Sequence, residues 1–356
     1  MELLDKGVEE GVYPGAVLLV AEKGRIIFLN EVGNLSTIPR ILPMKKDTIF
    51  DLASLTKPLA TTLAIMGLVN DGRINLDQPL SEIVRTGALG DKGTLTPRLI
   101  LSHCAGFKDW MPFYIDLLKY SSDARKKVLR EKIIEQPLQY TPGTGTLYSD
   151  LGFMILEWLV EEASGRTLKD YVHRNFYIPM GLKRTYLSDG DMPFDIREYA
   201  ATEDCPWRNR IIQGVVHDEN AYAAGGYSGH AGLFGTAEEV FSIANILRGH
   251  YLGKRSDYFS PGIVRAFFTR QEIIKGSTWA LGWDTPSPKN SSAGKYISLN
   301  SVGHLGFSGT SLWMDLEKDI LTVFLSNRIH PTRNNMNIRS FRPLLHDLIF
   351  NEMTRI

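Results

Sequence analysis

Ser54-Leu55-Thr56-Lys57 places a hydroxyl and an ammonium three residues apart, directly before an apolar stretch. Residues at this spacing share one face of a helix, so Ser54 and Lys57 point the same way if a helix begins here. A serine is a poor nucleophile until a base takes its proton. A lysine titrates at about 10.4, and desolvation or nearby cations lower that value until it can serve as the base. The spacing therefore predicts a nucleophile and its base.

The stretch that follows Lys57 has the pattern of a buried helix. Apolar residues recur every three or four positions from Leu55 to Val69, and only Thr61 and Thr62 interrupt the apolar run after Lys57. A helix that is apolar nearly all round lies inside a protein. Because proline disfavours helical geometry at the residue before it, Pro58 predicts a tight first turn.

Serine is also a favoured helix N-cap, so capping alone is the alternative role for Ser54. The same spacing recurs at Ser292 and Lys295, inside a stretch rich in Pro, Asn, Ser and Gly. That stretch predicts a loop with no helix behind it. The predicted helix after Ser54 distinguishes the two copies.

A second candidate segment is Tyr148-Ser149-Asp150, which directly precedes another predicted helix. A phenol titrates near 10, and beside a lysine ammonium it ionises more easily and can relay protons. The pattern is not specific, because Tyr114 and Asp116 repeat it. The alternative is a tyrosine of the core or of a turn.

A third candidate segment runs from Gly303 to Gly309 and includes His304, Gly306 and Phe307. Glycines that lead into a strand let a substrate approach the backbone closely. Exposed N–H groups on such an edge can stabilise an oxyanion. The alternative is a glycine-rich hairpin whose histidine only orders the turn.

Other catalytic classes lack the spacing they require. The serines of Gly226–Gly229 and Gly306–Gly309 each miss the Gly-x-Ser-x-Gly elbow by one residue. His217, Asp218, Glu219 and His230 are the residue types of a metal site, but no His-Glu-x-x-His or paired-cysteine spacing supports one. We therefore predict no metal, and interpret His217 and Asp218 as residues that order a loop.

The balance of charged residues argues against some classes of binding partner. The chain has 356 residues with 40 Lys+Arg and 40 Asp+Glu, so its net charge is zero. A nucleic-acid or anionic-membrane partner would need a basic excess. Cys104 and Cys205 are too few for a disulfide framework. The first residues show no basic region followed by an apolar run, the pattern of a secretion signal, so we expect a cytoplasmic protein. A periplasmic or extracellular protein whose signal peptide has been removed would have the same kind of sequence, and this alternative stays open.

Strand and helix patterns predict an α/β fold. Two short apolar runs around residues 22–24 predict a hairpin, and helices are expected at 96–101, 151–163, 237–247 and 338–349. Strands are expected at 279–284, 309–315 and 320–326. We predict an antiparallel sheet lobe built from residues 1–50 and 276–356, with a mainly helical lobe, 51–275, inserted and the active site between the lobes. The alternative of two consecutive domains would leave the hairpin alone and marginally stable.

In their order along the chain, the three candidate segments resemble the motifs of the penicillin-recognising serine hydrolases, which include class C β-lactamases, DD-carboxypeptidases and family VIII esterases. Ser54 to Lys57 resembles the first motif, Tyr148 to Asp150 the Tyr-x-Asn motif, and His304 to Gly306 the Lys-Thr-Gly motif in its His-x-Gly form. The resemblance spans about residues 10–350. Framework segments resemble the family too: 96–106, 140–143, 178–182 and 229–237.

This resemblance implies a β-lactamase-like fold and a two-step acyl transfer through an acyl-enzyme on Ser54. Lys57 and Tyr148 would share the general-base and general-acid work, and the N–H groups of Ser54 and Phe307 would hold the oxyanion. The implied substrates are small esters, D-amino-acid peptides or cell-wall fragments, with no metal or organic cofactor. Residues 216–221 also resemble a subgroup linked with cell-wall peptide turnover.

Two departures from the family pattern bear on the substrate. Asp150 stands where asparagine is usual, and a carboxylate would bind the Lys57 ammonium and keep it protonated. His304 stands where a lysine meets substrate carboxylates, so we expect weak or no β-lactamase activity. Arg328 and Arg333 are candidates for the missing cation. A non-catalytic ligand sensor is the alternative function, and a metal-dependent hydrolase is the third.

Overall fold

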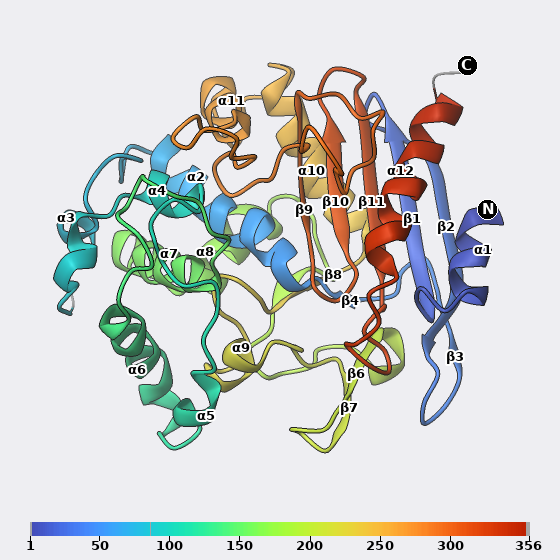
Figure 1. Cartoon of the computed structure of the whole chain (residues 1–356), viewed down its shortest axis with the longest axis horizontal. Helices are drawn as coiled ribbons and strands as arrows, with labels where there is room; N and C mark the ends of the chain where they lie inside the picture. The colour runs from blue at the N-terminus through green and yellow to red at the C-terminus, as the bar shows by residue number, and fades with distance from the viewer. Residues whose placement is uncertain (1, 86, 354–356) are drawn as a thin grey trace.

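The computed structural model describes residues 2–85 and 87–353. Its centre is a six-stranded antiparallel sheet in the order β3-β2-β1-β11-β10-β9, built from both ends of the chain (Figure 1). The strands are β1 (Gly15–Glu22), β2 (Arg25–Ser36), β3 (Leu42–Pro43), β9 (Ser301–Leu305), β10 (Ser311–Asp315) and β11 (Ile320–Ser326). The predicted sheet is confirmed, whereas the boundaries proposed for the two lobes stay a prediction.

Helices cover both faces of this sheet. In β1, Val17 and Leu19 belong to the main core, while Leu18 belongs to a second core formed with α12 (Ile338–Met353) and α1 (Glu2–Glu9). Helix α10 (Ala237–Tyr251) packs on the opposite face (Figure 1). Successive side chains of a strand point to opposite faces, so covering both faces explains why β1 is apolar without alternation.

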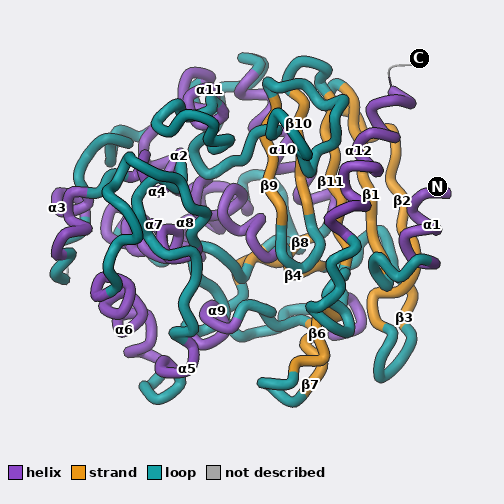
Figure 2. Tube along the Cα trace, in the orientation of Figure 1, coloured by secondary structure: helices purple, strands orange, loops and turns teal. Residues whose placement is uncertain are grey.

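The remaining helices gather beside the sheet, joined by many loops (Figure 2). They are α2 (Leu63–Asn70), α3 (Leu80–Ile83), α4 (Pro97–Leu101), α5 (Tyr114–Leu117), α6 (Ser122–Glu135), α7 (Asp150–Ser164), α8 (Leu168–Val172), α9 (Glu219–Ala223) and α11 (Pro261–Phe268). Helix α7 is buried from Leu151 to Val160; the Ser149 side chain caps its start, and Gly165, at φ +70°, ends it. Within the described residues, no helix has the length and apolarity to cross a membrane.

Two small sheets complete the fold. One has the order β4 (Phe50–Asp51), β8 (Leu233–Gly235), β5 (Tyr186–Leu187), and the other pairs β6 (Ala201–Cys205) with β7 (Arg210–Gln213). Asp51 pairs with Phe234, so the segment that leads into Ser54 lies against the chain that follows His230.

The strand predicted at 279–284 is wrong. Single bridges join Trp279 to Asp284 and Asp284 to Gly303, and the chain between them turns back on itself through Gly282, at φ +74°. Its apolar side chains face the main core from a turn, which gives the same burial as a strand would. Strand β9 was not predicted, because its glycine and histidine break the apolar pattern.

Candidate active site

Ser54 lies in a 3₁₀ turn, Ala53–Leu55, which continues through a wide helical turn, Lys57–Thr62, into α2. The first turn, at Ala53–Leu55, is tight as expected, but Pro58 lies in the wide turn that follows, so the tight turn predicted at Pro58 itself is wrong. The residue at the N-cap position is Leu52, so Ser54 is not the N-cap. Ala53 adopts φ +47°, and its N–H donates to Asp51 Oδ1 at 2.9 Å. Asp51 thus holds a strained backbone that side chains rarely adopt, directly before Ser54.

The structure brings the predicted nucleophile, amine and phenol together. Lys57 Nζ, with a fully buried side chain, donates to Ser54 Oγ at 3.2 Å and to Asp150 Oδ1 at 2.6 Å. Lys57 Nζ also lies 4.7 Å from the centroid of the Tyr148 ring, and Lys57 and Ser54 both act on the pKa of the Tyr148 phenol. Segments far apart in the sequence therefore place an alcohol, an amine and a phenol within mutual reach.

The charge state of this group follows from burial and from Asp150. Burial lowers the pKa of Lys57, but attraction to Asp150 and Tyr148 outweighs it, so the pKa of Lys57 is raised and the amine is charged at rest, as predicted. Burial raises the pKa of Tyr148, and the nearby Lys57 offsets this only in part. The expectation that Tyr148 ionises more easily is therefore wrong, because desolvation of the phenolate dominates.

Two rings that sequence reasoning missed pack against Tyr148. The His103 and Trp279 ring centroids lie 4.7 Å and 5.6 Å from that of Tyr148. His103 Nδ1 accepts from the Ser149 N–H at 3.1 Å, and burial lowers the pKa of His103 well below its usual value. Neutral His103 fixes the start of α7, which carries Asp150. Its segment resembled the family framework, but nothing local marked His103 as a partner of Tyr148.

His304 offers an acceptor to the site instead of a cation. Its Nδ1 lies 2.8 Å from the Leu305 carbonyl oxygen, so Nδ1–H donates and Nε2 keeps a lone pair. Burial, with repulsion from Lys57, lowers the pKa of His304 to about 3. Among the described residues Nε2 has no hydrogen-bond partner. The predicted loss of a positive charge at this position is thus confirmed.

The turn containing Gly306 and Phe307 is fixed to the nucleophile segment. Ser308 Oγ donates to the Asp51 carbonyl oxygen at 2.8 Å, and Thr310 Oγ1 donates to that of Leu52 at 3.1 Å. In the described part of the chain, the N–H groups of Ser54 and Phe307 donate to no protein acceptor. They are free to bind an oxyanion, and that role stays a prediction.

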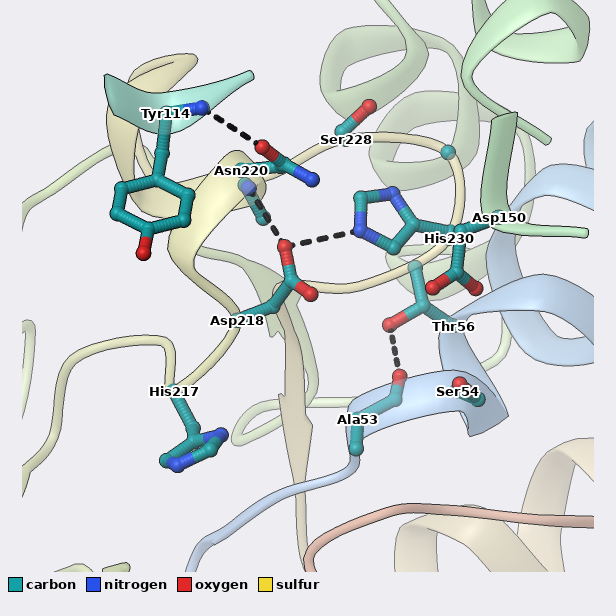
Figure 3. A network of polar contacts seen from close by, with 12 residues as sticks. Ala53, Ser54, Thr56, Tyr114, Asp150, His217, Asp218, Asn220, Ser228 and His230 are labelled. Atoms are coloured by element: carbon teal, nitrogen blue, oxygen red, sulfur yellow. Dashed lines mark hydrogen bonds and ion pairs between the residues drawn. The ribbon is translucent and has the colours of Figure 1, made fainter. Parts of the chain in front are cut away.

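Asp218 and His230 form a second charged group beside Asp150 (Figure 3). His230 Nε2 lies 2.9 Å from Asp218 Oδ1, and one ligand atom from each of Asp150, Asp218 and His230 lies within 4.8 Å of the others. A metal ion bound here would be repelled by the positive charge of Lys57, whose Nζ lies 2.6 Å from Asp150 Oδ1. The Asp218 carboxylate accepts from the Ala221 N–H at 2.7 Å, which confirms the predicted loop-ordering role of Asp218. The His217 ring Nε2 lies 3.1 Å from Glu203 Oε2 in β6, and this side-chain contact ties the loop to β6.

All the predicted site residues except buried Lys57 line one cavity of about 740 Å³. They are Ser54, Tyr148, Asp150, His304, Gly306 and Phe307. Arg333, a candidate for the missing cation, also lines it, but Glu203 and Glu219 neutralise its guanidinium at 2.6 Å and 2.7 Å. Arg328 has no such partner among the described carboxylates.

Comparisons with known proteins agree with this geometry. A model of the family described as Beta-lactamase matches residues 2–342. A Bacillus subtilis protein named N-acetylmuramyl-L-alanine amidase is 31% identical, covering 92% of this chain and 80% of its own. A protein of Escherichia coli O157:H7 named putative D-alanyl-D-alanine carboxypeptidase is 30% identical, covering 92% of this chain and 82% of its own.

Solved structures show the same fold. One titled "EstCE1, a hydrolase with promiscuous acyltransferase activity" has a TM-score of 0.73 at 20% identity, covering 96% of this chain and 97% of its own. An octameric penicillin-binding protein homologue from Pyrococcus abyssi has a TM-score of 0.71 at 18% identity, covering 96% of this chain and 75% of its own. The chain belongs to the Beta-lactamase family and is a serine hydrolase, as the predicted resemblance implied.

Proposed function

We propose that this protein hydrolyses amides or esters of small, cell-wall-type acyl compounds through an acyl-enzyme on Ser54. The observation that supports this most is the grouping of Ser54, Lys57 and Tyr148 at one cavity, where Lys57 Nζ donates to Ser54 Oγ and lies 4.7 Å from the centroid of the Tyr148 ring. Such a group supplies a nucleophile and a proton relay in one place.

In the proposed first step, the Ser54 oxygen bonds to the substrate carbonyl carbon. The Ser54 proton passes to the Lys57–Tyr148 pair, which must have lost one proton beforehand. The carbonyl oxygen takes up the electron pair and is held by the Ser54 and Phe307 N–H groups. When the carbon–leaving-group bond breaks, the pair returns its proton to the leaving nitrogen or oxygen.

In the second step, water attacks the acyl-enzyme. The pair takes one proton from that water, the ester bond to Ser54 breaks, and the Ser54 oxygen regains a proton. Electrons and protons balance over the cycle without a cofactor, since the pair ends in the state in which it began.

The relatives narrow the proposed substrate class. One is named N-acetylmuramyl-L-alanine amidase, and another is named putative D-alanyl-D-alanine carboxypeptidase. We therefore favour amide bonds of cell-wall peptides over simple esters. Because His304 is neutral, we expect weak or no hydrolysis of β-lactams.

A fluorophosphonate probe tests the nucleophile. We expect labelling of Ser54, loss of labelling in Ser54→Ala, and unchanged labelling in Ser292→Ala, which removes the other Ser-x-x-Lys serine. Labelling that persists in Ser54→Ala would contradict the proposal.

A ligand sensor is the second candidate, favoured by the charged Lys57 that Asp150 maintains. It predicts binding of peptidoglycan fragments without turnover of 4-nitrophenyl acetate, nitrocefin or D-Ala-D-Ala peptides. Turnover of any of these, lost in Ser54→Ala, would exclude it.

A further inference from the structure

Four ionisable side chains form one connected group beside the nucleophile: Lys57, Asp150, His230 and Asp218. Lys57 Nζ donates to Asp150 Oδ1 at 2.6 Å, and His230 Nε2 lies 2.9 Å from Asp218 Oδ1. One atom from each of Asp150, His230 and Asp218 lies within 4.8 Å of the others, and Figure 3 shows the imidazole between the two carboxylates. Within this group the carboxylates therefore face two cations when His230 is protonated, and one when it is neutral.

Helix α7 fixes the place of His230. Glu157, buried in α7 and paired with Lys126, accepts from the Gly229 N–H at 2.9 Å. His230, the next residue, is 1% exposed, and its carbonyl oxygen accepts from Lys57 Nζ at 3.5 Å. The helix that carries the carboxylate bound to Lys57 thus also holds the segment that carries the imidazole.

The surroundings of His230 favour its charged form. Burial lowers the pKa of His230, but attraction to Asp218 and Asp150 outweighs it, so the pKa is raised above its ordinary value. Its Nδ1 has no hydrogen-bond partner among the described residues, so the bond from the ring goes to Asp218. The imidazole is therefore a second cation of the group, with the charge of Asp218 on one side and that of Asp150 on the other.

Asp218 is itself held as a carboxylate. Its Oδ1 accepts from the Ala221 N–H at 2.7 Å, and a hydrogen bond to the charged form favours that form. Burial raises the pKa of Asp218, but attraction to His230 outweighs it and the pKa is lowered. Two further ionisable groups act on Asp218: His217 attracts it and Asp51 repels it. Asp218 is thus a lasting counter-charge for His230.

The charge of His230 also acts on Lys57. Repulsion from Lys57 lowers the pKa of His230, and because repulsion is mutual, a charged His230 lowers the pKa of Lys57. A neutral His230 would leave the group with one more unit of negative charge. Lys57 would then hold its proton more tightly.

We propose that His230 is a positioning residue which, as an imidazolium between Asp150 and Asp218, opposes the positive charge of Lys57 and so eases the loss of a proton from the Lys57–Tyr148 pair. His230 acts through these groups and touches no reacting atom. The inference rests on the proposed function, because it assumes that the pair must lose a proton before acylation.

The pH profile of His230→Gln tests this role. We expect the acidic limb of kcat/KM for 4-nitrophenyl acetate to move to higher pH by about one unit, which is about a tenfold lower kcat/KM at a fixed pH on the limb. His250→Gln is the control, because His250 is also buried and its Nε2 lies 3.1 Å from Asp257 Oδ1, outside the cavity lining. A merely structural role would lower kcat/KM by one factor at every pH, and an unmoved limb in His230→Gln would overturn the proposal.

A double variant distinguishes charge from shape. His230→Gln leaves one carboxylate of the group uncompensated, and adding Asp218→Asn removes that charge. We expect the limb of the double variant to return toward its position in the unaltered protein, whereas adding Asp257→Asn to His230→Gln should leave the limb where His230→Gln put it. A limb that stays in place, or moves to still higher pH, when Asp218→Asn is added would overturn the proposal.

An NMR titration separates this inference from the proposed hydrolysis, because it needs no turnover. In ¹⁵N-labelled Ser54→Ala protein, the ring nitrogens of His230 are identified by their loss on adding His230→Gln. We expect His230 to titrate above the ordinary histidine pKa of about 6.5, and at lower pH when Asp150→Asn is added. Titration below the ordinary value would refute the role of His230 alone. Absent turnover of every substrate, with His230 titrating as expected, would refute the proposed hydrolysis alone.

Discussion

Asp150 Oδ1 accepts a hydrogen bond from the fully buried Lys57 Nζ at 2.6 Å, and this contact determines how the site can start a reaction. A charged Lys57 cannot accept the Ser54 proton. The Lys57–Tyr148 pair must therefore lose a proton before acylation, and Asp150 opposes that loss by raising the pKa of Lys57.

The first prediction concerns pH. Because acylation needs the deprotonated pair, the acidic limb of the kcat/KM profile should rise with pH. Asp150 raises the pKa of Lys57, so Asp150→Asn should lower it and move that limb toward lower pH. Asp109→Asn, which alters an aspartate outside the cavity lining, is the control and should leave the limb in place. A shift of the limb toward higher pH in Asp150→Asn would contradict this assignment.

The second prediction concerns Tyr148. If its phenol relays the proton, Tyr148→Phe should lower kcat by about 10² to 10⁴, the usual contribution of a general acid–base group. Tyr114→Phe is a matched control, because Tyr114 has the same Tyr-x-Asp pattern outside the cavity. Steady-state kinetics on one ester suffices; equal kcat in the two variants would remove Tyr148 from the relay.

The third prediction concerns Lys57. Lys57→Gln removes the amine, and we expect kcat to fall by about a thousandfold or more, since the proton relay loses its base. Circular dichroism should show whether the variant folds with Asp150 left unpaired. Retained activity in a folded Lys57→Gln protein would assign the base elsewhere.

The fourth prediction concerns Gly306. A Cβ there would lie 2.0 Å from Thr310 Oγ1 and 2.7 Å from the Leu52 carbonyl oxygen, so Gly306→Ala must shift the turn that carries Phe307. We expect a large loss of kcat, because a misplaced Phe307 N–H no longer faces the oxyanion. Gly262→Ala is the control: its Cβ would meet no atom within 4 Å, and activity should be unchanged. Equal kcat in Gly306→Ala and the unaltered protein would argue against this oxyanion site.

Local patterns predicted much of the fold. The apolar run of β11, the turn at Gly24 and the glycine after α7 are signals carried by neighbouring residues, and the structure has each feature in its expected place. At residues 279–284 the apolar side chains did not distinguish a strand from a turn, because both are buried and need the same side chains. Whether such a segment is a strand depends on its pairing with a segment distant in sequence, which the neighbouring residues do not reveal.

The candidate site shows the same limit. The spacing of Ser54 and Lys57 could be read directly, since both belong to one turn. The place of His103 in the site could not be predicted, because it depends on a contact with Tyr148, which is distant in sequence. The charge of Lys57 was predictable from Asp150, whereas the raised pKa of Tyr148 depended on burial that only the folded chain shows.

Trapping the covalent intermediate tests the central claim most directly. A 4-nitrophenyl ester should be mixed with the protein, quenched in acid within seconds, digested and examined by mass spectrometry. We predict the acyl mass on the peptide containing Ser54, in the unaltered protein and not in Ser54→Ala. Turnover of the ester by Ser54→Ala at the original rate, or an acyl group found only on another residue, would contradict the account.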